Sequence, residues 1–157
     1  MTTQHPTRQL REFDSEGDEL RRVQLPHDME PLHAVESPTG TFIVGRYKYQ
    51  EQDVYQGDVV EVNTGGEVLR QFSGSRLSSL GKTPHVAFDS HGNIFVADWS
   101  NRRILLLNAH LSLRRVIIDE HQLNYKSPLR LCYREQSGQL WVGLGKGVVA
   151  VFDVLCR

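Results

Sequence analysis

The sequence lacks the features that mark several large classes of protein. It contains only two cysteines, Cys132 and Cys156, too few for the disulfide framework of a small secreted domain. No stretch approaches the roughly 18 consecutive apolar residues of a membrane-spanning helix. Residues 1–11 are polar and lack the apolar run of a secretory signal. These absences predict a cytoplasmic protein with free thiols and no membrane partner.

An excess of charge of one sign is also missing, as are the common catalytic motifs. The net charge is −1, which argues against a protein built mainly to coat nucleic acid or an anionic membrane. Neither a nucleophile elbow, a phosphate-binding glycine loop nor a dinucleotide fingerprint is present. Zinc-type HExxH or paired-cysteine spacings are missing as well. We therefore expect no enzymatic activity and no bound cofactor or metal.

What the sequence does contain is an internal repeat. Prolines that begin short apolar runs are followed after 9, 8 and 10 residues by a glycine, and each glycine is followed four positions later by a valine. A second element, of the form Leu-Arg-Arg or Leu-Arg-Gln, recurs at intervals of 49 and 44 residues. Such a period, cut into short apolar runs by turn residues, is typical of four-stranded propeller blades. The repeated prolines are Pro31, Pro84 and Pro128.

The repeat predicts an all-β fold, a partial β-propeller of about three four-stranded antiparallel blades, or half of a six-bladed ring. We expect one incomplete propeller over residues 1–157. Residues 8–25 would form strands three and four of a partial blade, residues 31–72 and 84–118 two whole blades, and residues 128–154 three strands of the last. An open arc leaves apolar faces and strand edges uncovered. The chain is then the C-terminal half of a longer protein, a half-ring completed by a second copy (a homodimer), or a truncated sequence.

The second repeat unit resembles an NHL repeat. Its Gly92-Asn-Ile-Phe-Val-Ala-Asp98 segment, followed by Asn101-Arg-Arg-Ile104, has that family's glycine turn, apolar strand ending in Ala-Asp, and Asn-x-Arg-Ile. The other two units lack this Asp and Asn. Short polar side chains suit a tight connection between strands, so we expect Asp98 and Asn101 to bond backbone N–H groups there and Arg103 to reach a carboxylate or carbonyl.

The resemblance implies a non-catalytic binding module. NHL propellers occur in tripartite-motif proteins, where they follow RING, B-box and coiled-coil segments and bind protein or RNA. The cysteine and histidine spacings of RING and B-box domains are absent from this sequence. Ubiquitin-ligase activity would therefore belong only to a longer parent protein.

A partner is expected on one face of the propeller, where the loops after strands two and four gather. Aromatic residues interleaved with cations in these loops favour a protein partner, with single-stranded RNA as a second candidate. A merely solvated loop face is the plainer interpretation. The predicted partner-binding residues are Arg46, Tyr47, Lys48, Tyr49, Arg76, Lys82, Trp99, Arg102, Tyr125 and Lys126.

The alternative function is a fragment of a metal-dependent propeller hydrolase or lyase, in which innermost strands supply metal ligands. His33 and His85 follow the prolines of their innermost strands by two and one residues, and the third unit has Arg130 there. A one-residue difference in a strand reverses the direction of a side chain. A gap-free alignment therefore predicts that the two histidines lie on opposite faces, which disfavours a shared site.

Overall fold

The protein is described by a computed structural model covering residues 8–50, 54–75, 78–81 and 84–154. Within these ranges the chain forms fifteen strands, one three-residue 3₁₀ turn at Gly145–Gly147, and no α-helix. The all-β class predicted from the sequence is therefore confirmed.

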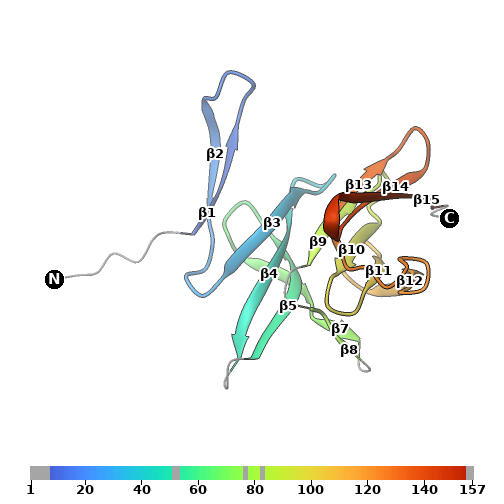
Figure 1. Cartoon of the computed structure of the whole chain (residues 1–157). Coiled ribbons are helices and arrows are strands. Elements are labelled where there is room, and N and C mark those ends of the chain that lie inside the picture. The colour runs from blue at the N-terminus through green and yellow to red at the C-terminus, as the bar shows by residue number, and fades with distance from the viewer. Residues whose placement is uncertain (1–7, 51–53, 76–77, 82–83, 155–157) are drawn as a thin grey trace.

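Three sheets follow one another along the chain, and each is an antiparallel meander whose strands neighbour in sequence order. Their first strands contact one another at the inner side of the arc, while the later strands spread outward (Figure 1). This is the arrangement of an open, partial β-propeller. The sheets comprise β3 (Glu30–Glu36), β4 (Phe42–Gln50), β5 (Val54–Val62) and β6 (Val68–Phe72); β9 (His85–Phe88), β10 (Ile94–Asp98), β11 (Arg103–Leu107) and β12 (Leu113–Ile118); and β13 (Pro128–Arg134), β14 (Gln139–Leu144) and β15 (Val148–Asp153).

Two small hairpins complete the described structure. Strands β1 (Gln9–Phe13) and β2 (Glu19–Gln24) pair with each other and project from the N-terminal end of the arc (Figure 1). Strands β7 (Gly74–Ser75) and β8 (Ser78–Ser79) form a short ribbon between the first and second sheets.

The β1–β2, β5–β6 and β11–β12 turns are each built by one side chain. Asp14, Asn63 and Asn108 each use Oδ1 to accept the backbone N–H groups two and four residues later, at 2.9–3.0 Å. Such side chains close turns because they replace a backbone acceptor. The third residue after each has a positive φ: Gly17, Gly66 and Leu111.

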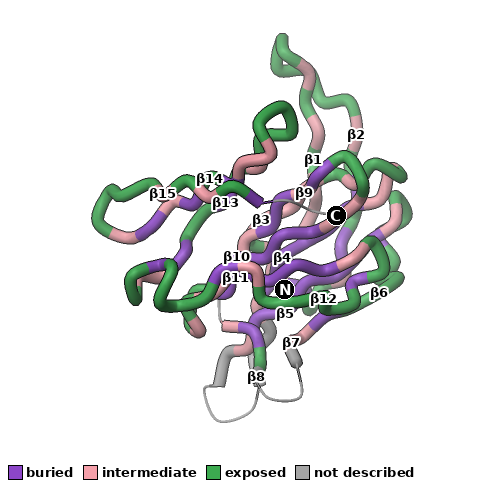
Figure 2. The backbone as a smooth tube through the Cα atoms, turned by 90° about the vertical axis from the view of Figure 1, so that its right-hand side faces the viewer, coloured by how far each residue is buried: buried purple, intermediate pink, exposed green. Residues whose placement is uncertain are grey.

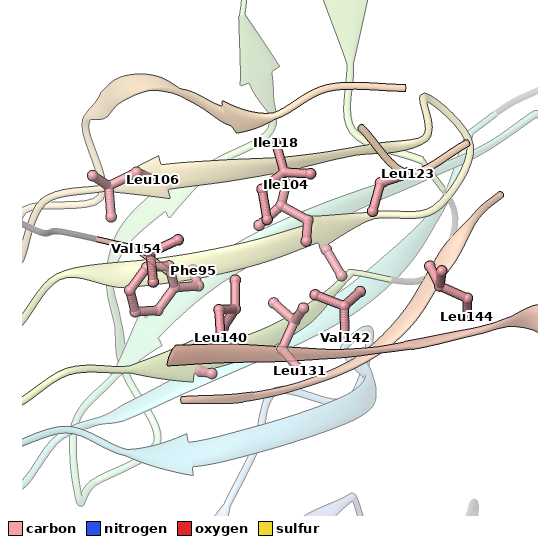
Figure 3. Packing of buried hydrophobic residues seen from close by; sticks show 12 residues of the cluster. Phe95, Ile104, Leu106, Ile118, Leu123, Leu131, Leu140, Val142, Leu144 and Val154 are labelled. Atoms are coloured by element: carbon pink, nitrogen blue, oxygen red, sulfur yellow. The ribbon is translucent and has the colours of Figure 1, made fainter. Parts of the chain in front are cut away.

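The core consists of three apolar layers, each between neighbouring sheets. One lies between the β1–β2 hairpin and the first sheet, the second between the first and second sheets, and the third between the second and third sheets. The third layer, which includes Phe95 and Leu140, is shown in Figure 3. Buried segments accordingly run along the inner strands, while the outer strands β6, β12 and β15 and most turns are exposed (Figure 2). Each sheet is therefore stabilised mainly by its neighbours.

The placement of Arg46, Tyr47, Lys48 and Tyr49 in a loop is wrong. Strand β4 continues to Gln50 and β5 begins at Val54, with pairs from Arg46↔Asp58 to Gln50↔Val54. Residues of high strand propensity, among them Tyr47 and Tyr55, extend the ladder. The first sheet thus has a longer central hairpin than the second.

Candidate functional site

Each innermost strand contributes one polar side chain at the same level of the arc. His33 of β3 pairs with Gly45, His85 of β9 with Ala97, and Arg130 of β13 with Gly143. These three partners occupy the same place in the repeat, five residues after its glycine. The two histidines and the arginine are therefore equivalent positions of successive sheets. We call them the axial cluster.

The expectation that the two histidines lie on opposite faces is wrong. The register of β3 shifts between Pro31 and His33, and that of β13 shifts between Pro128 and Arg130. One extra residue in each strand, Leu32 or Leu129, absorbs the shift, and both leucines are exposed. Such bulges redirect the side chains that follow. The rings of His33 and His85 consequently stack, with centroids 3.7 Å apart and planes inclined by 20°.

Backbone contacts determine the tautomers of both rings. The backbone N–H of Leu131 donates to Nδ1 of His85 at 3.2 Å, so the neutral ring of His85 carries its proton on Nε2. Nε2 of His33 lies 3.1 Å from the carbonyl oxygen of Val86, which can only accept, so His33 is protonated on Nε2 and leaves Nδ1 as an acceptor. These bonds also connect β3 to β9 and β9 to β13.

Burial keeps the two rings neutral. It lowers the pKa of His85 to about 4, with smaller contributions from the neighbouring His33 and from the charge of Arg130. Burial also lowers the pKa of His33, against the hydrogen bond to the carbonyl of Val86, which raises it. At neutral pH the only charged member of the axial cluster is Arg130.

The axial cluster does not supply a metal centre. Among the described residues, no three His, Cys, Asp or Glu side chains are grouped closely enough to hold a metal ion. The third position of the cluster is a guanidinium, which repels a cation. The metal-dependent alternative therefore has no candidate ligand set in the part of the chain that the structure describes.

One end of the arc contains the ends of β4, β10 and β12 and the beginnings of β3, β9 and β13, because neighbouring strands are antiparallel. The end of β4, the beginning of β5 and the β7–β8 ribbon also lie at this end (Figure 1). The axial cluster sits at the start of the innermost strands. Loop face and axial cluster thus share one end of the molecule.

Four of the predicted loop-face residues lie in the connections at this end. Trp99 is 40% exposed and Tyr125 is 53% exposed. Arg102 is exposed, with φ of 51°, and Lys126 is half-buried. Tyr125 is held in place by a 2.7 Å hydrogen bond between its hydroxyl and Nδ1 of His121. These side chains are available to a partner.

Of the other predicted loop-face residues, four belong to strand β4 and two lie outside the described residues. The assignment of Arg46 is wrong, because Arg46 is buried in β4 and forms two bonds with Asp58, at 2.6 and 3.2 Å. Tyr47 is half-buried in the same strand. Lys48 and Tyr49 also belong to β4, but their side chains lie outside the described ones, as do Arg76 and Lys82 altogether.

The NHL-like motif forms a compact polar network around a buried carboxylate. Asp98 accepts the backbone N–H of Gly81 at 2.9 Å, Nδ2 of Asn101 at 2.8 Å and Nε of Arg103 at 2.8 Å. Asn101 also donates to the carbonyl of Ser79, where we expected it to accept a backbone N–H. The network ties the β10–β11 turn to the segment that enters the second sheet.

The first sheet carries the same ion pair with its charges exchanged. Arg46 and Asp98 both lie six residues after the glycine of their repeats, and each pairs across the strands with an opposite charge, Asp58 or Arg103. In the third sheet this position is apolar, Leu144 with Val148. The glycine spacing alone could have identified Arg46 as a structural residue, and Asp58, which we missed, as its partner.

No helix among the described residues is long and apolar enough to span a membrane.

Comparison with known proteins identifies the fold but no family. The sequence matches no protein-family profile, and no curated protein resembles it. Among solved structures, a protein of unknown function from Bacteroides caccae is similar with 15% identity and a TM-score of 0.54, over 94% of this chain and 54% of the other. A catalytically inactive histidine-to-alanine variant of virginiamycin B lyase from Staphylococcus aureus, with quinupristin, is similar with 12% identity and a TM-score of 0.53, over 94% and 59%. The chain thus spans little more than half the length of these proteins, and the likeness is one of fold.

Proposed function

We propose that the chain is a non-catalytic binding module that recognises a protein partner through the loops at one end of the arc. The observation that carries this proposal is the exposure of two large aromatic side chains, Trp99 and Tyr125, and of the cation Arg102, which lies in the same turn as Trp99. Tryptophan, tyrosine and arginine are the residue types that dominate binding energy at protein interfaces.

The loop that presents Tyr125 is braced by internal hydrogen bonds and one buried side chain, which favours binding. Its backbone closes on itself, since the N–H groups of Leu123 and Tyr125 donate to the carbonyls of Asp119 and Glu120 at 3.1 and 2.7 Å. Leu123 is 1% exposed and anchors the loop in the third apolar layer. A preformed loop loses little conformational entropy when a partner binds.

The resemblance of residues 84–104 to an NHL repeat supports the same proposal, because NHL propellers act as binding domains. We also propose that this chain is part of a larger ring, since it covers only 54% and 59% of the solved structures that it resembles.

Selection of displayed peptides on the purified chain tests the proposal. We expect peptides whose binding is weakened at least about tenfold by Trp99→Ala or Tyr125→Ala, the loss typical of an interface anchor. Leu69→Ala is the control, because Leu69 is exposed to a similar degree, 48%, but lies on β6, the outermost strand of the first sheet. Peptides that bind both loop variants as well as the wild type would refute the proposal.

A parallel titration with a single-stranded RNA oligonucleotide separates the two partner classes. RNA recognition predicts affinity that falls steeply between low and moderate salt, because phosphate contacts release counterions. Salt-sensitive RNA binding that depends on Trp99 and Arg102 would replace the protein partner by RNA. Absence of binding at low salt would leave protein recognition as the proposal.

A further inference from the structure

A small recess opens beside the axial cluster. It has a volume of about 170 Å³ and is lined by Leu32, His33, Pro84, His85 and Arg130. A longer groove of about 720 Å³ along the innermost strands also borders His33 and His85. The recess is large enough for a few non-hydrogen atoms, since a water molecule occupies about 30 Å³ in the liquid. Its polar groups come from three different sheets, so they are placed by the tertiary fold.

The recess offers a defined set of hydrogen-bonding atoms. Because the backbone of Leu131 occupies Nδ1 of His85, the Nε2–H of His85 is left as a donor. Because the carbonyl of Val86 occupies Nε2 of His33, Nδ1 of His33 is left as an acceptor. Arg130 uses one guanidinium nitrogen on the carbonyl of Leu129 at 2.8 Å and retains further N–H groups.

The charge of the recess is positive and uncompensated. Arg130 forms no ion pair with an acidic side chain in the ranges that the structure describes. The two imidazoles beside it are neutral at pH 7, and no carboxylate lines the recess. A cation with unused donors next to a neutral imidazole donor favours an anion over any other ligand.

We propose that this recess binds the carboxylate group of a small organic acid, with the guanidinium of Arg130 and the Nε2–H of His85 donating to its oxygens. A hydroxyl or amide N–H next to the carboxylate would donate to Nδ1 of His33. The ligand would be held across the innermost strands of all three sheets. The proposal is independent of the loop-face partner, because it uses none of the loop residues.

The imidazole C–H resonances of the purified chain report binding directly. Acetate, glycolate and N-acetylalanine are titrated at pH 7 up to about 50 mM, which covers the millimolar affinities of single charged sites. We expect saturable shifts at His33 and His85 and none at the exposed His110. A saturating concentration of the acid should also raise the pKa of His85. The rise is about one unit if the anion binds tenfold more tightly when the imidazole is protonated.

Variants at Arg130 decide whether the site is specific. Arg130→Met should weaken binding at least tenfold, and Arg130→Lys should retain part of it, because the charge remains. Arg115→Met is the control, since Arg115 is exposed on the outer strand β12 and its loss should change the affinity less than twofold. Arg130 is exposed, so both variants are expected to fold.

The three acids distinguish the source of the carboxylate. Tighter binding of glycolate assigns the recess to free hydroxy acids, and tighter binding of N-acetylalanine assigns it to the C-terminus of a peptide. Equal binding of all three supports a carboxylate site without a neighbouring donor. Absence of saturable shifts with every acid, or equal affinities in Arg130→Met and wild type, would overturn the proposal.

Discussion

At the scale of single residues, a buried charge is tolerated only because its partner lies opposite. Arg46 and Asp58 are 8% and 2% exposed, and Gln71 adds a 2.7 Å bond to the same carboxylate. Removing one partner of a buried pair leaves an unpaired charge in a poorly solvated place. The second sheet carries the opposite arrangement, Asp98 with Arg103, at the equivalent position.

Arg46→Met should therefore lower the free energy of unfolding by about 3 kcal/mol, the usual cost of stranding a buried charge. The exchanged double variant, Arg46→Asp with Asp58→Arg, should recover more than half of this loss. Urea unfolding followed by fluorescence measures both. A double variant no more stable than the single one would show that the polarity of the pair matters.

The stacked histidines make stability depend on pH. The pKa of His85 is about 4 in the folded chain, below the value of about 6.5 expected when it unfolds, so the unfolded state binds the proton more readily. Stability is then complete above pH 6.5 and declines as the pH falls toward 4. The groups that face His85 are the imidazole of His33 and the guanidinium of Arg130, and both oppose the protonation of His85.

Urea unfolding midpoints at pH 7 and pH 5 test this expectation. The wild type should have a lower midpoint at pH 5, and His85→Asn should lose part of that difference. Asparagine does not titrate, and its Oδ1 can accept the N–H of Leu131 in place of Nδ1. Equal pH dependence in both proteins would show that His85 does not contribute.

At the scale of elements, the approach of neighbouring sheets depends on residues without a side chain. A Cβ at Gly57 of β5 would lie 1.9 Å from the carbonyl oxygen of Gly81, and one at Gly45 of β4 would lie 2.3 Å from that of Pro84. Both carbonyls belong to the segment that leads into β9. The first and second sheets can therefore approach this closely only because Gly45 and Gly57 have no side chain.

Gly57→Ala should accordingly destabilise the chain by about 2 kcal/mol, within the range for overpacked sites. Gly145→Ala is the control, because nothing lies within 4 Å of a Cβ there and its φ is not positive. Thermal unfolding should separate the two variants by several degrees. Equal melting temperatures would mean that the first and second sheets adjust to the added methyl group.

At the scale of the whole molecule, the two ends of the arc differ. The outer face of the third sheet carries Trp141, Val149 and Val151, which are 37%, 59% and 45% exposed. The outer face of the β1–β2 hairpin instead presents the pairs Gln9↔Gln24 and Arg11↔Arg22. Because sheets of this fold are stabilised by stacking, the apolar end needs a cover.

We expect the purified chain to self-associate through the outer face of its third sheet. Val149→Lys with Val151→Lys should raise the dissociation constant at least tenfold in analytical ultracentrifugation, whereas Leu69→Lys, at a similarly exposed site on β6, should not. Arg11→Glu tests the geometry of association. It should weaken association if the hairpin of one copy covers the third sheet of another and completes the ring, and it should have no effect in any other geometry. A monomer at all concentrations would contradict the expectation.

The sequence by itself determined the all-β class and the order of most strands. Short apolar runs and turn residues such as Asn63 act over a few residues, so their effect is legible without knowing the fold. The repeat then indicated stacked sheets, because each unit has more apolar surface than it can bury alone.

Only the tertiary structure decided what the candidate sites contain. The extra residues Leu32 and Leu129 bring His33, His85 and Arg130 to one level, and pairing with Asp58 removes Arg46 from the surface. Both outcomes depend on strand register and on contacts between residues distant in the chain. A shift of one residue in strand register barely changes the local sequence pattern but reverses the direction of every side chain beyond it. Packing between the sheets, and not the sequence pattern, therefore places these groups.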